Sequence, residues 1–158
     1  YYTDSIIGDF IVKSKMEPWW QNTLVIFVAD HGHPLPGHDA NDRPSKFHIP
    51  LIFSGGALKT KGVINAIGSQ TDIATTILDQ LKLPVDKFKW GKDLLDSSAK
   101  QFAFYSFNNG FGFVTPQGTA TVDNVSKKLI YKDAGFDTSN IKFGKAYMEF
   151  SYEDYLRR

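Results

Sequence analysis

The chain has 158 residues, of which 42% are hydrophobic and 15% aromatic, enough for one folded domain with a buried core. Its 18 Lys and Arg residues nearly balance its 17 Asp and Glu residues, and the sequence holds no basic run, which argues against a nucleic-acid partner. It holds no cysteine, which excludes disulfides, Cys-ligated zinc and a thiol nucleophile within these residues.

No apolar stretch approaches the roughly 20 residues that span a bilayer, and the first ten residues lack the order of a signal peptide. The sequence therefore predicts a soluble chain. It opens within a helical pattern and without an initiator Met, so we expect it to be a fragment of a longer protein, with any membrane anchor upstream.

A helix and a strand are predicted first. Apolar side chains recur at helical spacing within residues 3–16, namely at Ile6, Ile7, Phe10 and Ile11. Residues 23–30 then form a continuous β-branched and aromatic run, which is typical of a strand covered on both faces. The pattern favours an α/β fold with a mainly parallel or mixed sheet.

Residues 31–48 form a long, irregular segment with three prolines, and long loops in compact domains are often functional. A second short strand is predicted at 49–56. A helix follows at about 70–81, where Ser69 and Asp72 have the spacing of a capping box. We therefore interpret Asp72 as a capping residue and not as a catalyst.

Short apolar runs separated by turn residues follow and predict an antiparallel meander; they are residues 101–107, 111–116, 119–124 and 127–133. A terminal helix is expected from the spacing of Phe143, Tyr147 and Phe150. The aromatic run 102–116 admits two interpretations, core strands or a stacking platform for carbohydrates or bases, and core strands are the commoner explanation.

The histidines are clustered, since all four lie within residues 31–48: His31, His33, His38 and His48. Carboxylates lie in or beside the same segment, at Asp30, Asp39 and Asp42, and this mixture of nitrogen and oxygen donors suits Zn²⁺ or Mn²⁺. In an extended strand Asp30 and His31 would point to opposite faces, but Gly32 permits a turn that lets both face one ion. The alternative is that these side chains bind loop backbone and solvent.

Three ordered blocks carry a resemblance to a known family: "NTLVIFVADHGH", "KFHIPLIFSGG" and "GSQTDIATTILDQLKLP". Together they resemble the C-terminal half of a sulfatase-type catalytic domain of the alkaline phosphatase superfamily. The closest likeness is to bacterial lipoteichoic acid synthase-like sulfatase proteins. The resemblance extends over roughly residues 2–95 and includes "WGKDLL"; it departs from the family at Thr75, where proline is common.

The resemblance implies an alkaline-phosphatase-like α/β sandwich fragment, with a mixed sheet flanked by helices and a small antiparallel C-terminal portion. Residues 1–100 would then form the C-terminal portion of the catalytic core. Residues 101–158 would supply antiparallel strands and the terminal helix of the same domain.

The resemblance also implies metal-dependent hydrolysis or transfer of a sulfate or phosphate ester. It assigns Asp30 and His31 as ligands of a divalent metal, Mn, Zn or Ca. It places His48 beside the substrate, and residues with a weaker claim to substrate contact are His33, His38 and Lys46. The nucleophile and the remaining acidic ligands are expected upstream, in the N-terminal half of the same domain, so we expect this chain to be inactive alone.

Such proteins are often anchored in a bacterial membrane with the catalytic domain on its extracytoplasmic face, which is the location that the resemblance implies. Two other interpretations remain open. In the first, the chain keeps the fold as a noncatalytic binding module, a pseudoenzyme. In the second, the His-rich segment stores or senses metal, which predicts tight metal binding by the chain alone.

Overall fold

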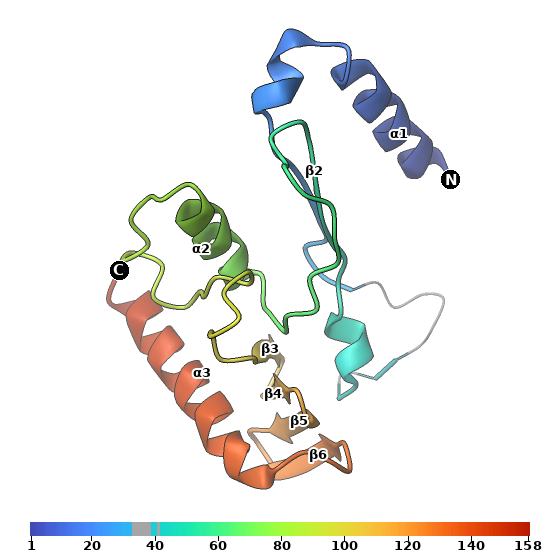
Figure 1. Ribbon diagram of the computed structural model, residues 1–158. Helices are drawn as coiled ribbons and strands as arrows, with labels where there is room; N and C mark the ends of the chain where they lie inside the picture. The colour runs from blue at the N-terminus through green and yellow to red at the C-terminus, as the bar shows by residue number, and fades with distance from the viewer. Residues whose placement is uncertain (33–38, 41) are drawn as a thin grey trace. The chain divides into compact units, whose positions relative to one another are not determined.

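The structure is a computed structural model that describes residues 1–32, 39, 40 and 42–158 (Figure 1). The chain divides into two compact units. The first contains Tyr1–Gly32 and His48–Val63, and the second contains the described residues of 39–47 together with Ile64–Arg158. This division follows contacts within the chain, whereas the boundary expected near residue 100 follows the family resemblance and stays a prediction.

The first unit begins with helix α1, Tyr2–Ser14, as the apolar spacing predicts. A short 3₁₀ helix, η1, follows at Pro18–Asn22. Most of the expected apolar stripe of α1 is exposed, because Ile6, Ile7 and Phe10 all face solvent in this chain and only Ser14 is buried.

Strands β1, Val25–Val28, and β2, Leu51–Ser54, form an antiparallel pair with Val28 opposite Leu51. The expectation of a strand covered on both faces is wrong for the described residues, since β1 is half-buried and Val28 is 44% exposed. An unbroken apolar run shows that a strand is apolar but not which elements cover it. The described strand pairs are all antiparallel, so the parallel pairing is not seen there.

Two glycines after β2 hold the pair of strands against the residues before β1. Gly55 has φ +118°, and a Cβ at this position would lie 2.1 Å from the carbonyl oxygen of Thr23. The Gly56 N–H donates to the carbonyl of Trp20 at 3.2 Å, and the Trp20 ring is buried. Only glycine fits this close approach. The two glycines directly follow Ser54, the last residue of β2.

The second unit contains helix α2, Thr71–Gln80, and a four-stranded antiparallel sheet in the order β3-β4-β5-β6. Its strands are β3 Ala103–Phe107, β4 Gly110–Thr115, β5 Gly118–Asp123 and β6 Lys128–Lys132. The predicted meander is therefore confirmed. A 3₁₀ turn, η3 at Thr138–Asn140, leads into the terminal helix α3, Ile141–Leu156.

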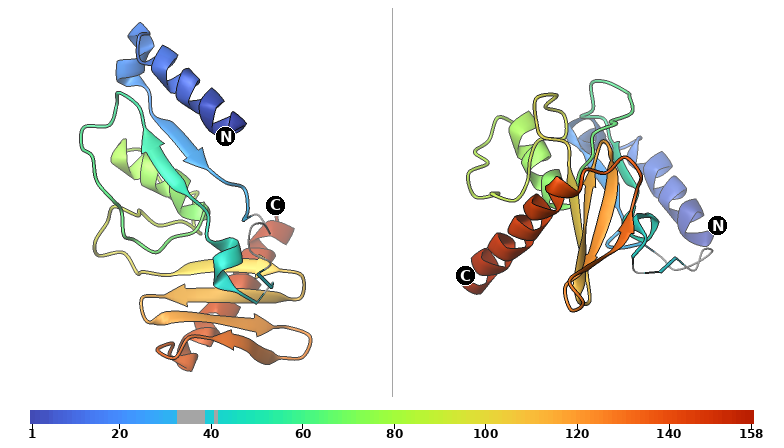
Figure 2. Two further views of the ribbon diagram at one scale, coloured as in Figure 1. Left: turned by 90° about the vertical axis from the view of Figure 1, so that its right-hand side faces the viewer. Right: turned by 90° about the horizontal axis from the view of Figure 1, so that it is seen from below.

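Helix α3 packs on one face of this sheet (Figure 2). Phe111 and Phe113 of β4 are buried, and a Cβ at Gly144 of α3 would lie 2.8 Å from the Phe111 ring. The missing side chain at Gly144 lets the helix approach the sheet closely. The aromatic run thus supplies core strands, as the commoner interpretation predicts.

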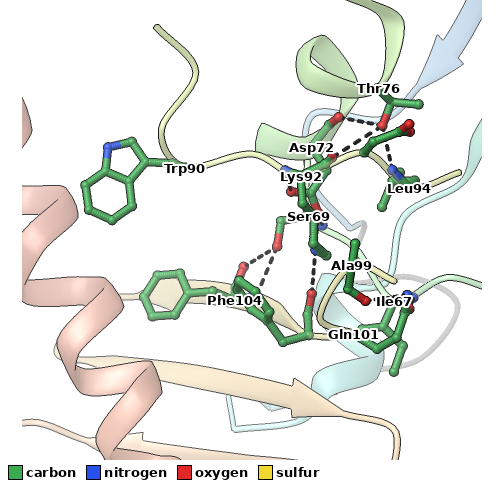
Figure 3. A network of polar contacts seen from close by, with 12 residues as sticks. Ile67, Ser69, Asp72, Thr76, Trp90, Lys92, Leu94, Ala99, Gln101 and Phe104 are labelled. Carbon is green, nitrogen blue, oxygen red and sulfur yellow. Dashed lines mark hydrogen bonds and ion pairs between the residues drawn. The ribbon is translucent and has the colours of Figure 1, made fainter. Parts of the chain in front are cut away.

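A buried carboxylate organises the start of α2 (Figure 3). Asp72 Oδ2 accepts hydrogen bonds from the Ser69 N–H at 2.8 Å and from the Lys92 ammonium at 2.6 Å, while Oδ1 accepts from the Lys92 N–H at 2.9 Å. The same ammonium donates to the carbonyl of Phe102 at 2.9 Å. Asp72 thus makes one half of the expected capping box, its bond with the Ser69 N–H. The other half is not formed, because α2 has Gln70 as its N-cap with no side-chain cap bond, and the Ser69 hydroxyl bonds to the backbone of Phe104.

Thr76 extends this network one turn further along α2. Its hydroxyl donates to the carbonyl of Asp72 at 2.8 Å and accepts from the Leu94 N–H at 2.9 Å. Where Gly91 passes the helix, a Cβ would lie 2.2 Å from the hydroxyl oxygen of Thr75. The "WGKDLL" block therefore binds directly to the helix that precedes it.

Removal of the Lys92 ammonium should destabilise the chain. In the Lys92→Met variant the carboxylate of Asp72, which is 2% exposed, keeps its backbone donors and loses its counter-charge. We expect the free energy of unfolding, measured by urea denaturation, to fall by about 3 kcal/mol.

The control is Arg157→Met, which breaks a surface pair between Arg157 and Glu153 with side chains 78% and 58% exposed. This change should lower the free energy of unfolding by less than about 0.5 kcal/mol. Equal effects of the two substitutions would contradict the structural role of the buried pair.

Candidate functional site

Asp30 and His31 follow β1, where the chain bends, and their side chains lie next to each other. Asp30 Oδ2 is 3.6 Å from His31 Nε2, and the His31 N–H donates to Asp30 Oδ1 at 2.9 Å. Both side chains are open to solvent, with exposed fractions of 88% for Asp30 and 77% for His31. Two adjacent residues thus present a carboxylate and an imidazole to the same place.

The hydrogen bond of the His31 ring bears on what the ring can bind. Nδ1 lies 2.9 Å from the carbonyl oxygen of Gly32, and because a carbonyl only accepts, Nδ1 carries a proton in this bond. The other nitrogen of a neutral ring then holds a lone pair, which is the form in which imidazole binds a metal. A ring nitrogen 3.6 Å from a carboxylate oxygen is a pair of donors suited to a metal ion.

This donor set has the right chemistry for a divalent metal and too few members to enclose one. Among residues 1–32, 39, 40 and 42–158 no group of three or more His, Cys, Asp or Glu side chains is placed to hold a metal ion. Zinc sites have three or four protein ligands. Asp30 and His31 therefore fit part of a coordination sphere.

His48 lies at the same end of the β1–β2 pair as Asp30 and His31. In an antiparallel pair the end of one strand is beside the start of the other, and here Val28 faces Leu51. His31 follows Val28 by three residues and His48 precedes Leu51 by three. His48, which is exposed, thus lies at the end of the β1–β2 ladder that Asp30 and His31 follow.

Lys46 lies in a 3₁₀ helix, η2, at Pro44–Phe47, where it is half-buried. Two carboxylates of the segment 31–48 contact other residues of the same segment. Asp39 accepts a hydrogen bond from Ser45, and Asp42 Oδ1 is 3.9 Å from Arg43 Nε. The predicted substrate contacts His33 and His38 lie outside the described residues.

The segment 42–47 is attached to the β3–β6 sheet by side chains that we do not assign from the sequence. The Phe47 ring stacks on the Tyr105 ring with a centroid distance of 4.1 Å and an angle of 12°. The hydroxyl of Thr121, which is fully buried, donates to the carbonyl of Asp42 at 2.8 Å. Glycine alternates with phenylalanine at 110–113, which was the available signal in the sequence. This pattern does not indicate that the segment 42–47 packs on the sheet.

Burial raises the pKa of Tyr105 to about 12, against the opposing effect of its hydrogen bond with Thr121. Negative charge on Tyr131, Asp42 and Asp133 acts in the same direction as burial. The phenol is therefore protonated throughout the physiological pH range and is available as a hydrogen-bond donor.

Comparison with known proteins identifies related chains. A family model described as Sulfatase matches residues 1–83. The chain is 31% identical over 104 residues to arylsulfatase K of Canis lupus familiaris, an alignment that covers 63% of this chain and 19% of the relative. It is 36% identical over 77 residues to the 2,3-bisphosphoglycerate-independent phosphoglycerate mutase of Metamycoplasma hominis, covering 48% of this chain and 15% of the relative.

A solved structure of a protein in the alkaline phosphatase superfamily from Vibrio parahaemolyticus has the same fold. The TM-score is 0.77 at 25% identity, and the match covers 99% of this chain and 40% of that one. The fold class predicted from the sequence, an alkaline-phosphatase-like α/β arrangement, is thereby confirmed. The chain spans about a fifth of the length of the arylsulfatase K relatives that it matches.

The raised pKa of Tyr105 predicts a loss of stability in alkali. The folded chain holds this proton to about pH 12, whereas an unfolded tyrosine loses it near pH 10. The contribution to the free energy of unfolding is complete below about pH 10 and is lost as the pH rises towards the folded pKa. Tyr105→Phe cannot ionise, so its stability should fall less than that of the parent over this window.

Urea denaturation at a series of pH values measures this difference. Tyr152→Phe changes an exposed side chain and leaves Tyr105 in place, so it serves as the control. Identical alkaline profiles for the parent and Tyr105→Phe would show that the phenol is not held in its protonated form.

Proposed function

The chain belongs to the sulfatase family, and from that premise we propose that it supplies part of a metal-dependent site for hydrolysis or transfer of a sulfate or phosphate ester. The observation that carries the proposal is the pairing of Asp30 with His31, exposed and 3.6 Å apart, within the segment that matches the family.

Asp30 and His31 would hold a divalent ion such as Mn²⁺, Zn²⁺ or Ca²⁺. When bound, that ion would lower the pKa of a hydroxyl nucleophile and neutralise charge on the transferred group. The residues of this chain orient the site: the carbonyl of Gly32 fixes the His31 ring, and the His31 N–H holds one carboxylate oxygen of Asp30.

Substrate binding is proposed for cationic and hydrogen-bonding groups of residues 31–48. His48 would donate a hydrogen bond to a non-bridging oxygen of the ester, and Lys46 would contribute positive charge. His33 and His38 are further proposed contacts. The nucleophile and the remaining metal ligands would come from the N-terminal half of the catalytic domain, so this chain alone would be inactive.

Sulfate and phosphate esters present the same tetrahedral oxyanion to such a site. The relatives include proteins named for each chemistry, an arylsulfatase and a phosphoglycerate mutase. We propose the shared oxyanion chemistry, with phosphoglycerol transfer of the lipoteichoic acid synthase kind as a narrower form of it. No described helix is long and apolar enough to cross a membrane; an extracytoplasmic location beside an upstream anchor is part of the proposal.

A noncatalytic binding module is the second candidate, and one observation favours it. The described residues bring only two metal-binding side chains together, below the three or four of a zinc enzyme. The two candidates differ in whether residues beyond this chain complete the ligand set and supply a nucleophile.

Metal titration of the 158-residue chain tests the partial site. With only Asp30 and His31 as ligands, we expect calorimetry with Mn²⁺, Zn²⁺ or Ca²⁺ to give dissociation constants weaker than about 0.1 mM. Asp30→Ala should abolish this binding, and Asp79→Ala, which alters a carboxylate on α2, should leave it unchanged. Tight binding that survives Asp30→Ala would instead favour a metal-storing histidine segment.

Activity is tested in a protein that contains the chain together with the N-terminal half of the domain. Asp30→Ala and His31→Ala should each lower kcat/KM for an aryl sulfate or an aryl phosphate by about 100-fold or more. Because both side chains are exposed, the free energy of unfolding should change by less than about 0.5 kcal/mol. Full activity in either variant would refute the assignment, and an inactive parent would favour the noncatalytic module.

A further inference from the structure

The segment 42–47 has little structure of its own and depends on the sheet for its position. Its regular part is the four-residue 3₁₀ helix η2, in which the Lys46 N–H donates to the carbonyl of Arg43 at 3.2 Å. A 3₁₀ turn of this length is not stable in isolation. Figure 2 shows η2 on the face of the β3–β6 sheet opposite α3.

Two glycines of β4 make room for the surface on which this segment rests. Gly112 pairs with Tyr105 across the strands, and a Cβ at Gly112 would lie 1.9 Å from the Tyr105 ring. Gly110 pairs with Phe107 in the same way, with a Cβ 2.2 Å from that ring. The rings therefore lie over the glycines, where they meet Phe47: the Phe47 and Phe107 centroids are 6.1 Å apart.

The hydroxyl groups under the segment form a chain with one direction. Thr121 has a single hydroxyl proton, which it donates to the carbonyl of Asp42. The Tyr105 hydroxyl lies 2.7 Å from Thr121 Oγ1, and since the threonine proton is already used, Tyr105 is the donor. The order is thus Tyr105 O–H to Thr121 O–H to Asp42 C=O, which fixes the backbone at one end of the segment while Phe47 fixes the other.

Lys46 lies between these two attachments, and His48 follows the second attachment directly in the sequence. We propose that Tyr105 and Thr121 are positioning residues, which hold the segment 42–47 so that Lys46 meets an anionic sulfate or phosphate group. This inference rests on the proposed function, because it takes Lys46 as a substrate contact. A lysine has a flexible stem, so a fixed backbone lowers the entropy lost when its ammonium binds an oxyanion.

The sheet offers a matched set of variants. Thr121→Val keeps the shape of the side chain and removes the donor, and Thr121→Ser restores the hydroxyl. Thr115→Val is the control, because Thr115 is also buried and donates to a carbonyl, that of Gly118, in the β4–β5 turn. Each variant is prepared in the protein that is assayed for ester hydrolysis.

Two measurements test the proposal without relying on turnover. Hydrogen exchange at the Lys46 amide reports how firmly the segment is held, and a titration with inorganic sulfate followed by NMR reports binding of an oxyanion. We expect Thr121→Val to speed exchange roughly tenfold and to weaken sulfate binding roughly fivefold, with both values within about twofold of the parent in Thr121→Ser. Kinetically, Thr121→Val should raise KM and change kcat by less than about twofold.

The outcomes separate this proposal from the proposed function. Faster exchange with unchanged sulfate affinity, no sulfate binding at Lys46 in the parent, or the same changes in Thr115→Val would each overturn the positioning role. The parent protein could instead bind sulfate, with weaker binding in Thr121→Val, and yet hydrolyse neither sulfate nor phosphate esters. This result would support the positioning role and contradict the proposed catalysis.

Discussion

The second unit of the fold depends on the hydrogen bonds and the ion pair of one buried carboxylate, that of Asp72. It is 2% exposed and binds two backbone N–H groups and the ammonium of Lys92. Through Lys92 it also reaches the carbonyl of Phe102, immediately before β3. A buried charge must be paired and hydrogen-bonded. One side chain therefore fixes the start of α2, the segment at 92 and the approach to the sheet.

The β3–β6 sheet is used on both faces, and small residues make this possible. Gly144 lets α3 approach Phe111, while Gly112 gives space to the Tyr105 ring on the opposite face. One face provides the hydrophobic core and the other carries the segment 42–47. The C-terminal part of the chain thus supports the segment 42–47 as well as its own helix.

Asp30 and Asp72 have opposite environments. Asp72 is enclosed by donors and its charge is neutralised by Lys92. Asp30 is 88% exposed beside His31 at the end of a strand. The first arrangement stabilises the fold, and the second leaves the carboxylate at the surface, which is why we propose different roles for the two residues.

Local pattern in the sequence was sufficient for the helices, the meander, the bond of Asp72 with the Ser69 N–H and the adjacency of Asp30 and His31, since periodicity, turn residues and spacing act over a few positions. The family resemblance also came from ordered local blocks. Only the tertiary structure decided that Lys92 pairs with Asp72 from 20 residues away and that Thr121 binds Asp42 from 79 residues away. The partner of a buried polar group is chosen by packing in three dimensions, and spacing along the chain does not encode it.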